Sequence, residues 1–296
     1  MPGNETIGDA LQKSSSFFRR CGIAEPRMEA EILLAALLNV DRLCLVVNHG
    51  QVLTPEETER FKDAVQRRSK GEPTAYITGE KYFYGRQFFV DDNVLIPRPE
   101  TELIIDAVKQ CLDRRKTLSS KRLKAADLGT GSGILAVTLA LEFQLFSIWA
   151  VDISASALEV AQRNADFHGV RDRICFNHGD YFENLPRSGF SYPLDLVVAN
   201  PPYLSQEDIK LLPVGIKAYE PLEALRGGED GLDYYRKILA ELPAYLNRPG
   251  FVFMEIGDGA KNNVEALFRA SGLFSSLFWH YDLCGKPRVV EAESAN

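Results

Sequence analysis

The sequence has few of the residues from which metal sites and disulfide frameworks are built. It contains 5 cysteines and 4 histidines among 296 residues. No two cysteines form a C-x-x-C pair, and neither His168 nor His178 has a partner at the spacing of metal ligands. The sequence therefore predicts no metal site. An odd, scattered set favours free thiols in a reducing compartment over a disulfide framework: Cys21, Cys44, Cys111, Cys175 and Cys284.

Long apolar runs and an excess of positive charge are also missing. The most apolar stretches, such as Leu194 to Ala199, are far shorter than the roughly 18 residues that cross a bilayer, which predicts no membrane span. The first ten residues lack the basic and apolar regions of a secretory signal, so we expect a cytoplasmic protein. A net charge of −7 argues against tight direct binding to nucleic acid, because that affinity comes mainly from Lys and Arg at phosphates.

The remaining composition is that of an ordinary globular protein, and its length favours two domains. The first part is predicted to be helical. Thr54 and Glu57 stand at the two positions of a capping box, which indicates a helix running to about Ser69. An earlier amphipathic helix is indicated by a period near 3.6 residues in Met28, Ile32, Leu33, Ala36 and Leu37. We predict an all-helical N-terminal domain over residues 1–80.

The pattern changes after residue 80. Aromatic and β-branched residues between Tyr82 and Val90 surround Gly85 and Arg86, which predicts a β-hairpin. We interpret residues 81–97 as a β-hairpin linker. The segment that follows, rich in proline, leads into a predicted helix over residues 101–112.

Short apolar runs alternate with helical stretches beyond Lys121. Such alternation is typical of a parallel sheet covered by helices on both faces, so an α/β fold is predicted over residues 98–296. The runs that we predict as strands are Leu123–Leu128, Ser147–Asp152, Arg173–Asn177, Leu194–Ala199 and Gly250–Ile256, and a closing hairpin is predicted from Leu277–Tyr281 and Arg288–Glu291.

A glycine-rich loop follows the first predicted strand. The segment Gly129-Thr130-Gly131-Ser132-Gly133 places three glycines where the backbone turns tightly and approaches a ligand closely. Ile134 stands where the dinucleotide fingerprint needs its third glycine, which disfavours NAD, and no lysine follows as in a P-loop. The loop is therefore predicted to bind a cofactor of the nucleotide type.

Acidic residues end the next two predicted strands. Asp152 lies roughly 20 residues beyond the glycine loop, the offset at which a carboxylate meets a ribose in such folds. The alternative is that Asp152 only precedes or caps the helix that begins near Ser154. After the third strand, Asp180 offers a carboxylate to an exocyclic amine and Tyr181 offers an aromatic face to a purine.

The fourth predicted strand ends in Asn200-Pro201-Pro202-Tyr203. Two consecutive prolines have no N–H, so this backbone offers chiefly carbonyl acceptors and suits a donor-rich NH2 group. The Asn200 side-chain oxygen and the Pro201 carbonyl can each accept one hydrogen of a planar amide, while Tyr203 covers its flat face. We predict Asn200, Pro201 and Tyr203 as catalytic residues, with Pro202 completing the substrate strip. An ordinary turn after a strand is the alternative interpretation.

Two further segments contain glycine at or near the ends of predicted elements. Glu255-Ile256-Gly257 is interpreted as a strand end followed by a tight turn, with a structural role. Arg226 to Gly231 is interpreted as a mobile loop near the site, with the possible role of a lid.

At these residues the sequence closely resembles the HemK/PrmC family of peptide chain release factor glutamine N5-methyltransferases. The resemblance spans nearly the whole chain. It includes Tyr76 to Glu80, Ile96 to Glu102, Asp127 to Gly133, Asn200 to Tyr203 and Gly227 to Leu232. The combination is more specific than any one of these motifs.

The resemblance implies a class I fold that depends on S-adenosyl-L-methionine, with a Rossmann-like seven-stranded sheet behind a helical domain that helps to engage the release factor. It implies that the substrate is the glutamine of the Gly-Gly-Gln motif. By position, Asn200 to Tyr203 would hold that glutamine. The cofactor would be held by Gly129 to Gly133, Asp152, Tyr181 and Asn200. Arg98 and Glu100 to Glu102 match the segment that precedes the cofactor site, where the resemblance implies contact but no particular bond.

Other readings of the same motifs stay open. An adenine-N6 nucleic-acid methyltransferase would present the same flat NH2 group to the strip at Asn200. A ribosomal-protein glutamine methyltransferase would share every catalytic residue and differ in its N-terminal domain. A binding protein that retains the cofactor pocket without turnover is the third reading, and the intact Asn200 argues against it.

Overall fold

The computed structural model describes residues 5–115 and 121–295, apart from the side chain of Val214. The chain divides into two compact units. The first unit is Met1–Glu80 together with Pro213–Tyr219, and the second is Lys81–Leu212 together with Glu220–Asn296. The first unit therefore includes a short segment that follows the fourth predicted strand, and the hairpin region from Lys81 onward belongs to the second unit.

The first unit is helical, with α1 (Ile7–Arg20), α2 (Pro26–Leu38), α3 (Arg42–Val47), α4 (Pro55–Ser69), α5 (Thr74–Thr78) and α11 (Val214–Tyr219). The capping box expected at α4 is present, since the Thr54 side chain accepts from the Glu57 N–H and the Glu57 side chain accepts from the Thr54 N–H. Phe18, Leu34 and Phe61 are buried at the centre of this unit. Its helices thus enclose a core of their own.

The buried face of α2 matches the sequence pattern only in part, since Leu33 is buried and Leu37 packs against the core. The helix forms, but Met28 is exposed, and the residues that it buries are Ala30, Leu33, Leu34 and Ala35. The helix is apolar around most of its circumference, so hydrophobic periodicity alone could not determine which stripe faces the core.

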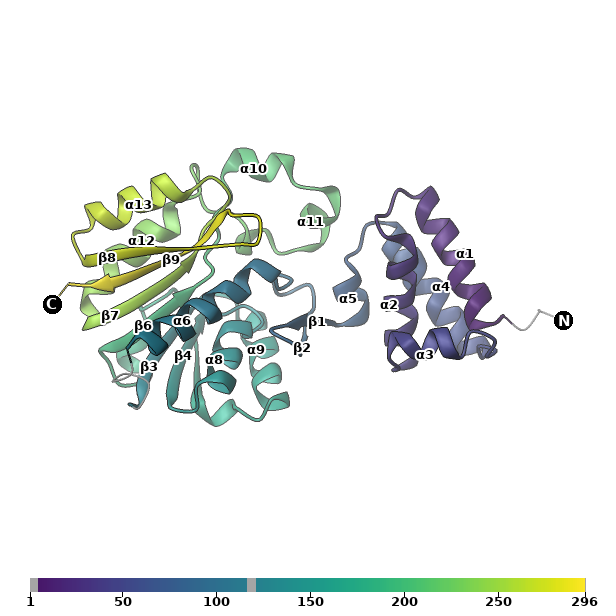
Figure 1. Cartoon of the computed structure of the whole chain (residues 1–296), viewed down its shortest axis with the longest axis horizontal. Helices are drawn as coiled ribbons and strands as arrows, with labels where there is room; N and C mark the ends of the chain where they lie inside the picture. The colour runs from purple at the N-terminus through teal and green to yellow at the C-terminus, as the bar shows by residue number, and fades with distance from the viewer. Residues whose placement is uncertain (1–4, 116–120, 296) are drawn as a thin grey trace. The chain divides into compact units, whose positions relative to one another are not determined.

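The second unit contains a seven-stranded sheet with the order β5-β4-β3-β6-β7-β9-β8 (Figure 1). The first five strands of this order are parallel, whereas β9 pairs antiparallel with both β7 and β8. This confirms the predicted α/β class. The strands are β3 (Leu123–Leu128), β4 (Phe146–Asp152), β5 (Ile174–His178), β6 (Leu194–Ala199), β7 (Leu246–Glu255), β8 (Phe274–Tyr281) and β9 (Pro287–Ser294).

Helices cover both faces of the sheet (Figure 1). One face packs against α6 (Glu102–Arg114), α8 (Ile134–Glu142) and α9 (Ala155–Phe167), and the other against α12 (Asp233–Glu241) and α13 (Lys261–Ala270). Neighbouring strand residues alternate between the two cores, as the pleat requires. Shorter helical segments are α10 (Gln206–Leu211), η1 (Pro99–Thr101), η2 (Arg171–Arg173), η3 (Leu185–Arg187), η4 (Leu222–Ala224) and η5 (Leu242–Ala244).

The predicted strand β7 begins earlier than the sequence suggested. It starts at Leu246 rather than Gly250, because Leu246 pairs with Leu194 across a register shift before the regular ladder resumes. Arg248 and Pro249 lie in this first part and are exposed, so no apolar pattern marks it in the sequence.

The hairpin of β1 (Glu80–Phe83) and β2 (Arg86–Phe89) contributes to the core of the second unit. Phe83 and Phe88 are fully buried there, with their rings edge to face at 6.2 Å. The Tyr84 hydroxyl donates to Asp106 of α6 at 2.9 Å. The segment that we interpreted as a linker is thus packed on the helices that support the sheet.

Candidate active site

The strand register places the carboxyl ends of four strands, β3, β4, β6 and β7, in one row. Leu128 pairs with both Val151 and Ala199, and Ala199 pairs with Met254. The residues that follow these partners are Gly129, Asp152, Asn200 and Glu255, so they lie side by side at the carboxyl edge of the sheet. The order of the strands also reverses between β3 and β6, and such a switch point is the usual ligand position in open α/β sheets.

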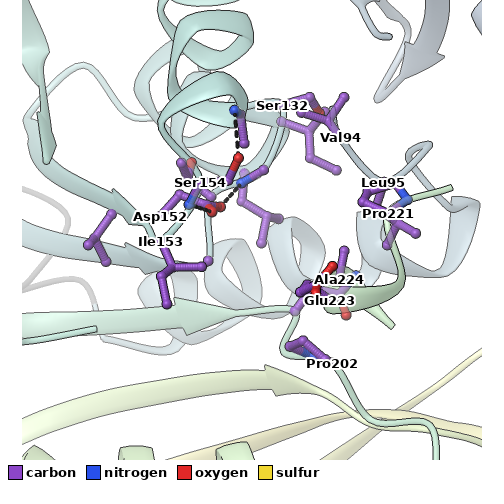
Figure 2. Close-up of a pocket in the computed structure, with 18 of the residues that line it drawn as sticks. Val94, Leu95, Ser132, Asp152, Ile153, Ser154, Pro202, Pro221, Glu223 and Ala224 are labelled. Atoms are coloured by element: carbon purple, nitrogen blue, oxygen red, sulfur yellow. Dashed lines mark hydrogen bonds between the residues drawn. The ribbon is translucent and has the colours of Figure 1, made fainter. Parts of the chain in front are cut away.

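A cavity of about 550 Å³ opens at this edge (Figure 2). Nine of the predicted site residues line it, namely Gly129, Thr130, Gly131, Ser132, Asp152, Asp180, Tyr181, Asn200 and Pro202. Gly133, Pro201 and Tyr203 do not belong to its lining. The predicted cofactor loop therefore shares one cavity with two residues of the substrate strip, Asn200 and Pro202.

The glycine loop adopts a backbone that favours glycine at three positions. Gly129, Gly131 and Gly133 have φ of 71°, 55° and 80°. A Cβ at Gly133 would lie 3.0 Å from the Cβ of Ala161 in α9 and 3.1 Å from its Cα. The third glycine thus allows α8 to pack closely against α9, whereas space remains open at the first two.

Asp152 is bonded to the same loop. Its Oδ2 accepts from the Gly131 N–H at 2.8 Å, and its Oδ1 accepts from the Ser154 N–H at 2.9 Å. Burial raises the pKa of the Asp152 carboxyl, while these backbone donors oppose the rise. The N-cap of α9 is Ser154 and not Asp152, because the Ser154 side chain accepts from the Ala157 N–H. Asp152 therefore points into the cavity with acceptor capacity left on both oxygens.

Asp180 and Tyr181 line the cavity beyond Asp152. The Asp180 carboxylate forms an ion pair with Lys237 of α12, so any exocyclic amine would share this oxygen pair with an ammonium group. Tyr181 has a positive φ of 47° and is buried, with its ring edge to face with Tyr234 at 5.9 Å. Burial raises the pKa of the Tyr181 hydroxyl well above its usual range. The ring is held in place as a neutral wall.

The substrate strip is bonded to Thr101, which also lines the cavity, and to the buried Glu255. The Asn200 Nδ2 donates to the Thr101 hydroxyl at 3.1 Å, and that hydroxyl donates to Glu255 Oε2 at 2.6 Å. The Tyr203 hydroxyl donates to the other Glu255 oxygen at 3.2 Å. Pro201, the next residue of the strip, is buried.

The roles of Glu255 and Thr101 in this hydrogen-bonded chain were not predicted, although Thr101 belongs to the segment Glu100 to Glu102 that was expected to contact the cofactor site. Glu255 was interpreted as a structural strand end, but its carboxylate is buried and joins two residues of the strip region. Burial raises the pKa of Glu255 to about 7, and the hydrogen bonds from Thr101 and Tyr203 oppose that rise. An acidic residue ending an otherwise apolar strand was the available signal.

The segment interpreted as a possible lid packs against the backbone behind the strip. Gly227 donates to the Leu204 carbonyl at 2.8 Å, and Leu204 donates to the Leu225 carbonyl at 3.0 Å. A Cβ at Gly227 would lie 2.8 Å from the Tyr203 backbone, and one at Gly231 would lie 2.4 Å from the Tyr203 oxygen. These glycines permit the close approach of the two chain segments.

The opposite wall of the cavity was only partly anticipated. Arg98 lines it, and its guanidinium donates to both oxygens of the buried Glu220 at 2.7 and 2.9 Å. Leu95, Pro221, Glu223 and Ala224 also line the cavity and are labelled in Figure 2. The Arg98–Glu220 pair thus joins the two segments that form this wall.

The cavity suits S-adenosyl-L-methionine in its hydrogen-bond acceptors, its apolar surface and its volume. The loop from Gly129 to Gly131 leaves open space where a side chain would intrude. Asp152 offers carboxylate oxygens to a pair of hydroxyl groups, and the adjacent Ile153 is 66% exposed at the rim and offers an apolar surface to a flat ring (Figure 2). Its volume lies within the range of small-molecule sites, about 300–1,000 Å³.

Comparison with protein families identifies two matches. Residues 9–79 match the PrmC N-terminal domain, and residues 105–214 match the methyltransferase small domain. Similar curated proteins share the description "Release factor glutamine methyltransferase". The one from Bacillus cereus is 39% identical over 97% of this chain and 99% of its own length. The one from Bacillus subtilis is 40% identical, with 97% of each covered.

Solved structures show the same fold at low sequence identity. The catalytic domain of human METTL16 in complex with an RNA hairpin of the MAT2A 3′ untranslated region has a TM-score of 0.55 at 13% identity, covering 82% of this chain and 84% of that one. The N-terminal domain of human METTL16 in complex with SAH has a TM-score of 0.52 at 13% identity, covering 80% and 82%.

Proposed function

Because the chain belongs to the release factor glutamine methyltransferase family, we propose that it transfers a methyl group from S-adenosyl-L-methionine to the side-chain N5 of a release factor glutamine. The target is the glutamine of the Gly-Gly-Gln motif, and its methylation supports translation termination. The observation that carries this proposal is the position of Asn200, which lines the same cavity as Asp152 and the glycine loop.

The cofactor is assigned to the loop side of the cavity. We propose that Gly129 to Ser132 approach it through their backbone, that Asp152 accepts from its ribose hydroxyls, and that Tyr181 and Asp180 border its base. Gly133 supports the loop through its packing on Ala161. When bound, the cofactor supplies an electrophilic methyl group on a sulfonium, whose sulfur keeps the electron pair of the broken bond.

The substrate amide is assigned to the strip. The Asn200 side-chain oxygen and the Pro201 carbonyl accept its two hydrogens, because an amide buried without partners would cost roughly 2–7 kcal/mol. Pro202 and Tyr203 complete the strip along its flat side. A carboxamide nitrogen is a weak nucleophile, so the rate rests on holding its lone pair in line with the methyl group and on stabilising the charge that develops on nitrogen before a proton leaves.

The N-terminal unit is proposed to engage the release factor as a protein. It carries the match to the PrmC N-terminal domain, and α3 exposes three large apolar side chains. Leu43, Val46 and Val47 are between 61% and 78% exposed, which is typical of a surface that contacts another protein. We place the reaction in the cytoplasm, where release factors act. No tight direct contact with nucleic acid is expected from a chain of net charge −7.

Within the described ranges, no helix has both the length and the apolar character needed to cross a membrane. Over the same residues, no group of three or more His, Cys, Asp or Glu side chains is arranged to hold a metal ion.

Mass spectrometry of an unmethylated release factor tests the proposed reaction. After incubation with this protein and S-adenosyl-L-methionine, a single added methyl group should map to the Gly-Gly-Gln glutamine. Asn200→Ala should abolish the transfer while retaining cofactor binding by calorimetry. Transfer of labelled methyl to ribosomal protein or nucleic acid, with none on the release factor, would instead favour one of the two other methyltransferase readings.

A further inference from the structure

Four side chains at the substrate strip form one hydrogen-bonded chain, and two of them, Asn200 and Thr101, line the cavity. It runs from Asn200 through Thr101 to Glu255, and Tyr203 joins at the second Glu255 oxygen. Thr101 and Glu255 are 0% and 2% exposed, so water does not compete for these bonds. The chain joins three elements that are distant in sequence, since 154 residues separate Thr101 from Glu255.

The bonds in this chain have a fixed direction. An ionised Glu255 can only accept, so the single hydroxyl proton of Thr101 is used in the 2.6 Å bond to Oε2. Thr101 can then only accept from Asn200, which requires the amide NH2 end of Asn200 to face Thr101. The Asn200 oxygen is consequently the end left for another donor. A side-chain amide without this constraint could turn over and offer NH2 in its place.

We propose that Thr101 and Glu255 are positioning residues for methyl transfer, which select the acceptor end of Asn200 for the substrate amide and hold Tyr203 beside it. This inference rests on the proposed function, because it concerns the same strip. Neither residue needs to touch the reacting atoms. Their effect is exerted through Asn200 and Tyr203.

The surroundings keep Glu255 and Tyr203 in place. The Tyr235 hydroxyl of α12 donates to the Glu255 backbone carbonyl at 2.7 Å. A Cβ at Gly257 would lie 2.9 Å from the Tyr203 ring, so this glycine admits the ring to its position. Because both ends of the Tyr203–Glu255 bond are packed in this way, the carboxylate presents both oxygens in a defined orientation.

Protonation of Glu255 would disrupt the direction of the bonds. A neutral carboxyl carries a hydrogen on one of its oxygens. That O–H would face the hydroxyl hydrogen of either Thr101 or Tyr203, so that two donors would meet. Burial raises the pKa of Glu255 to about 7. The charged groups that act on it are Glu100, which raises the pKa, and Arg288, which lowers it, and the titratable hydroxyl that faces it is Tyr203. We therefore expect kcat to rise with pH through about 7 as Glu255 ionises.

The first test compares Thr101→Val with Thr101→Ser. Valine keeps the shape of threonine but cannot accept from Asn200 or donate to Glu255, whereas serine keeps the hydroxyl and loses one methyl group. We expect Thr101→Val to lower kcat on the order of 10- to 100-fold, the size of effect that misplacement of a reacting group produces. Thr101→Ser should restore most of kcat. The affinity of both variants for S-adenosyl-L-methionine should stay within about 2-fold of the wild-type affinity.

The second test replaces Glu255 by Gln. Thr101 and Tyr203 donate to different oxygens of Glu255, and in glutamine one of these positions is an NH2 group, so one of the two hydroxyls would face a donor. We expect Glu255→Gln to lower kcat to a similar degree and to remove the rise through about pH 7. The matched control is Glu291→Gln on the neighbouring strand β9, where a buried carboxylate is bonded to Arg114 and His280 away from the cavity. It should lose stability while keeping the wild-type pH profile.

A spectroscopic measurement separates this inference from the proposed reaction. The side-chain amide resonances of Asn200 should shift in Thr101→Val and Glu255→Gln and return near the wild-type position in Thr101→Ser, whatever the methyl acceptor is. Absence of release factor methylation by the wild-type protein would refute the proposed function alone. Unchanged Asn200 resonances, or wild-type kcat in both Thr101→Val and Glu255→Gln, would refute the positioning role alone.

Discussion

The side-chain Nδ2 of Asn164 donates a hydrogen bond of 2.8 Å to the backbone carbonyl of Ser132. The same amide donates to the Phe89 carbonyl at 2.9 Å and accepts from the Phe89 N–H at 2.7 Å. Asn164 lies in α9 and is fully buried. One side chain therefore joins the glycine loop to the hairpin strand β2, and the loop geometry depends on a residue that does not line the cavity.

Asn164→Ala should destabilise the protein. It would leave the partly buried Phe89 backbone groups and the buried Ser132 carbonyl without this partner, at a cost of about 3 kcal/mol in the free energy of unfolding. Urea titration measures the change. Asn177→Ala is the control, because Asn177 in β5 makes only longer bonds, to Cys175. Equal losses in the two variants would contradict the bridging role of Asn164.

Gly133→Ala should destabilise the glycine loop by more than its backbone conformation alone explains. The positive φ of 80° costs an alanine roughly 1–2 kcal/mol, and the added Cβ would also press on Ala161 at 3.0 Å. Gly22→Ala is the control, since Gly22 has φ of 73° with nothing within 4 Å of the added Cβ. Thermal unfolding should show the larger loss for Gly133→Ala. Similar losses would show that the contact with Ala161 relaxes freely.

Asp152→Ala should weaken the binding of S-adenosyl-L-methionine. Loss of hydrogen bonds from ribose hydroxyls to a charged group corresponds to about 1–3 kcal/mol. Calorimetric titration measures the change. Asp195→Ala is the matched control, because Asp195 accepts from the Lys124 N–H at 2.8 Å and lies outside the cavity lining. Unchanged affinity in Asp152→Ala would remove the ribose assignment.

Asp127 should make stability depend on pH. Burial raises the pKa of its carboxyl from 3.8 to about 7, and its Oδ1 has no hydrogen-bond partner among the described residues. Between these two pKa values the folded state holds more protons than the unfolded state. The protonated Asp127 carboxyl therefore contributes its full stabilisation below about pH 4, and this stabilisation is lost as the pH rises through 7. The loss is at most about 4 kcal/mol.

Asp127→Asn tests that dependence, because the amide does not titrate. The stability of the wild type relative to this variant should fall from pH 4 to pH 8, as measured by urea unfolding at each pH. A difference between the two proteins that stays constant over this range would show that the carboxyl titrates near its ordinary pKa in the fold.

The apolar surface of α3 should affect the protein substrate and not the chemistry. Leu43→Ser with Val47→Ser should raise KM for an intact release factor several-fold, about 1 kcal/mol for lost apolar contact, while kcat changes little. A short Gly-Gly-Gln peptide should be methylated equally well by variant and wild type. Leu145→Ser is the control for removing an exposed apolar side chain in the second unit. An unchanged KM for the release factor would exclude α3 from recognition.

The sequence by itself determined the local features of this protein. Thr54 and Glu57 are three residues apart, so their capping box is encoded within one helical turn. The strands β3 and β6 were also predicted from local sequence. A parallel strand that is buried on both faces is a nearly uninterrupted run of apolar residues, which the sequence shows directly. The residues nominated for the cofactor and the substrate follow such strands directly.

The tertiary structure decided which of these ends meet and what supports them. The pairing of Ala199 with Met254 places Asn200 beside Glu255, and the entry of α6 brings Thr101 between them. It also assigned Pro213–Tyr219 to the helical unit. Such relationships depend on strand order and on packing between segments far apart in the chain. Local periodicity does not encode them, because the secondary-structure propensity of a residue does not depend on which distant residue folding brings beside it.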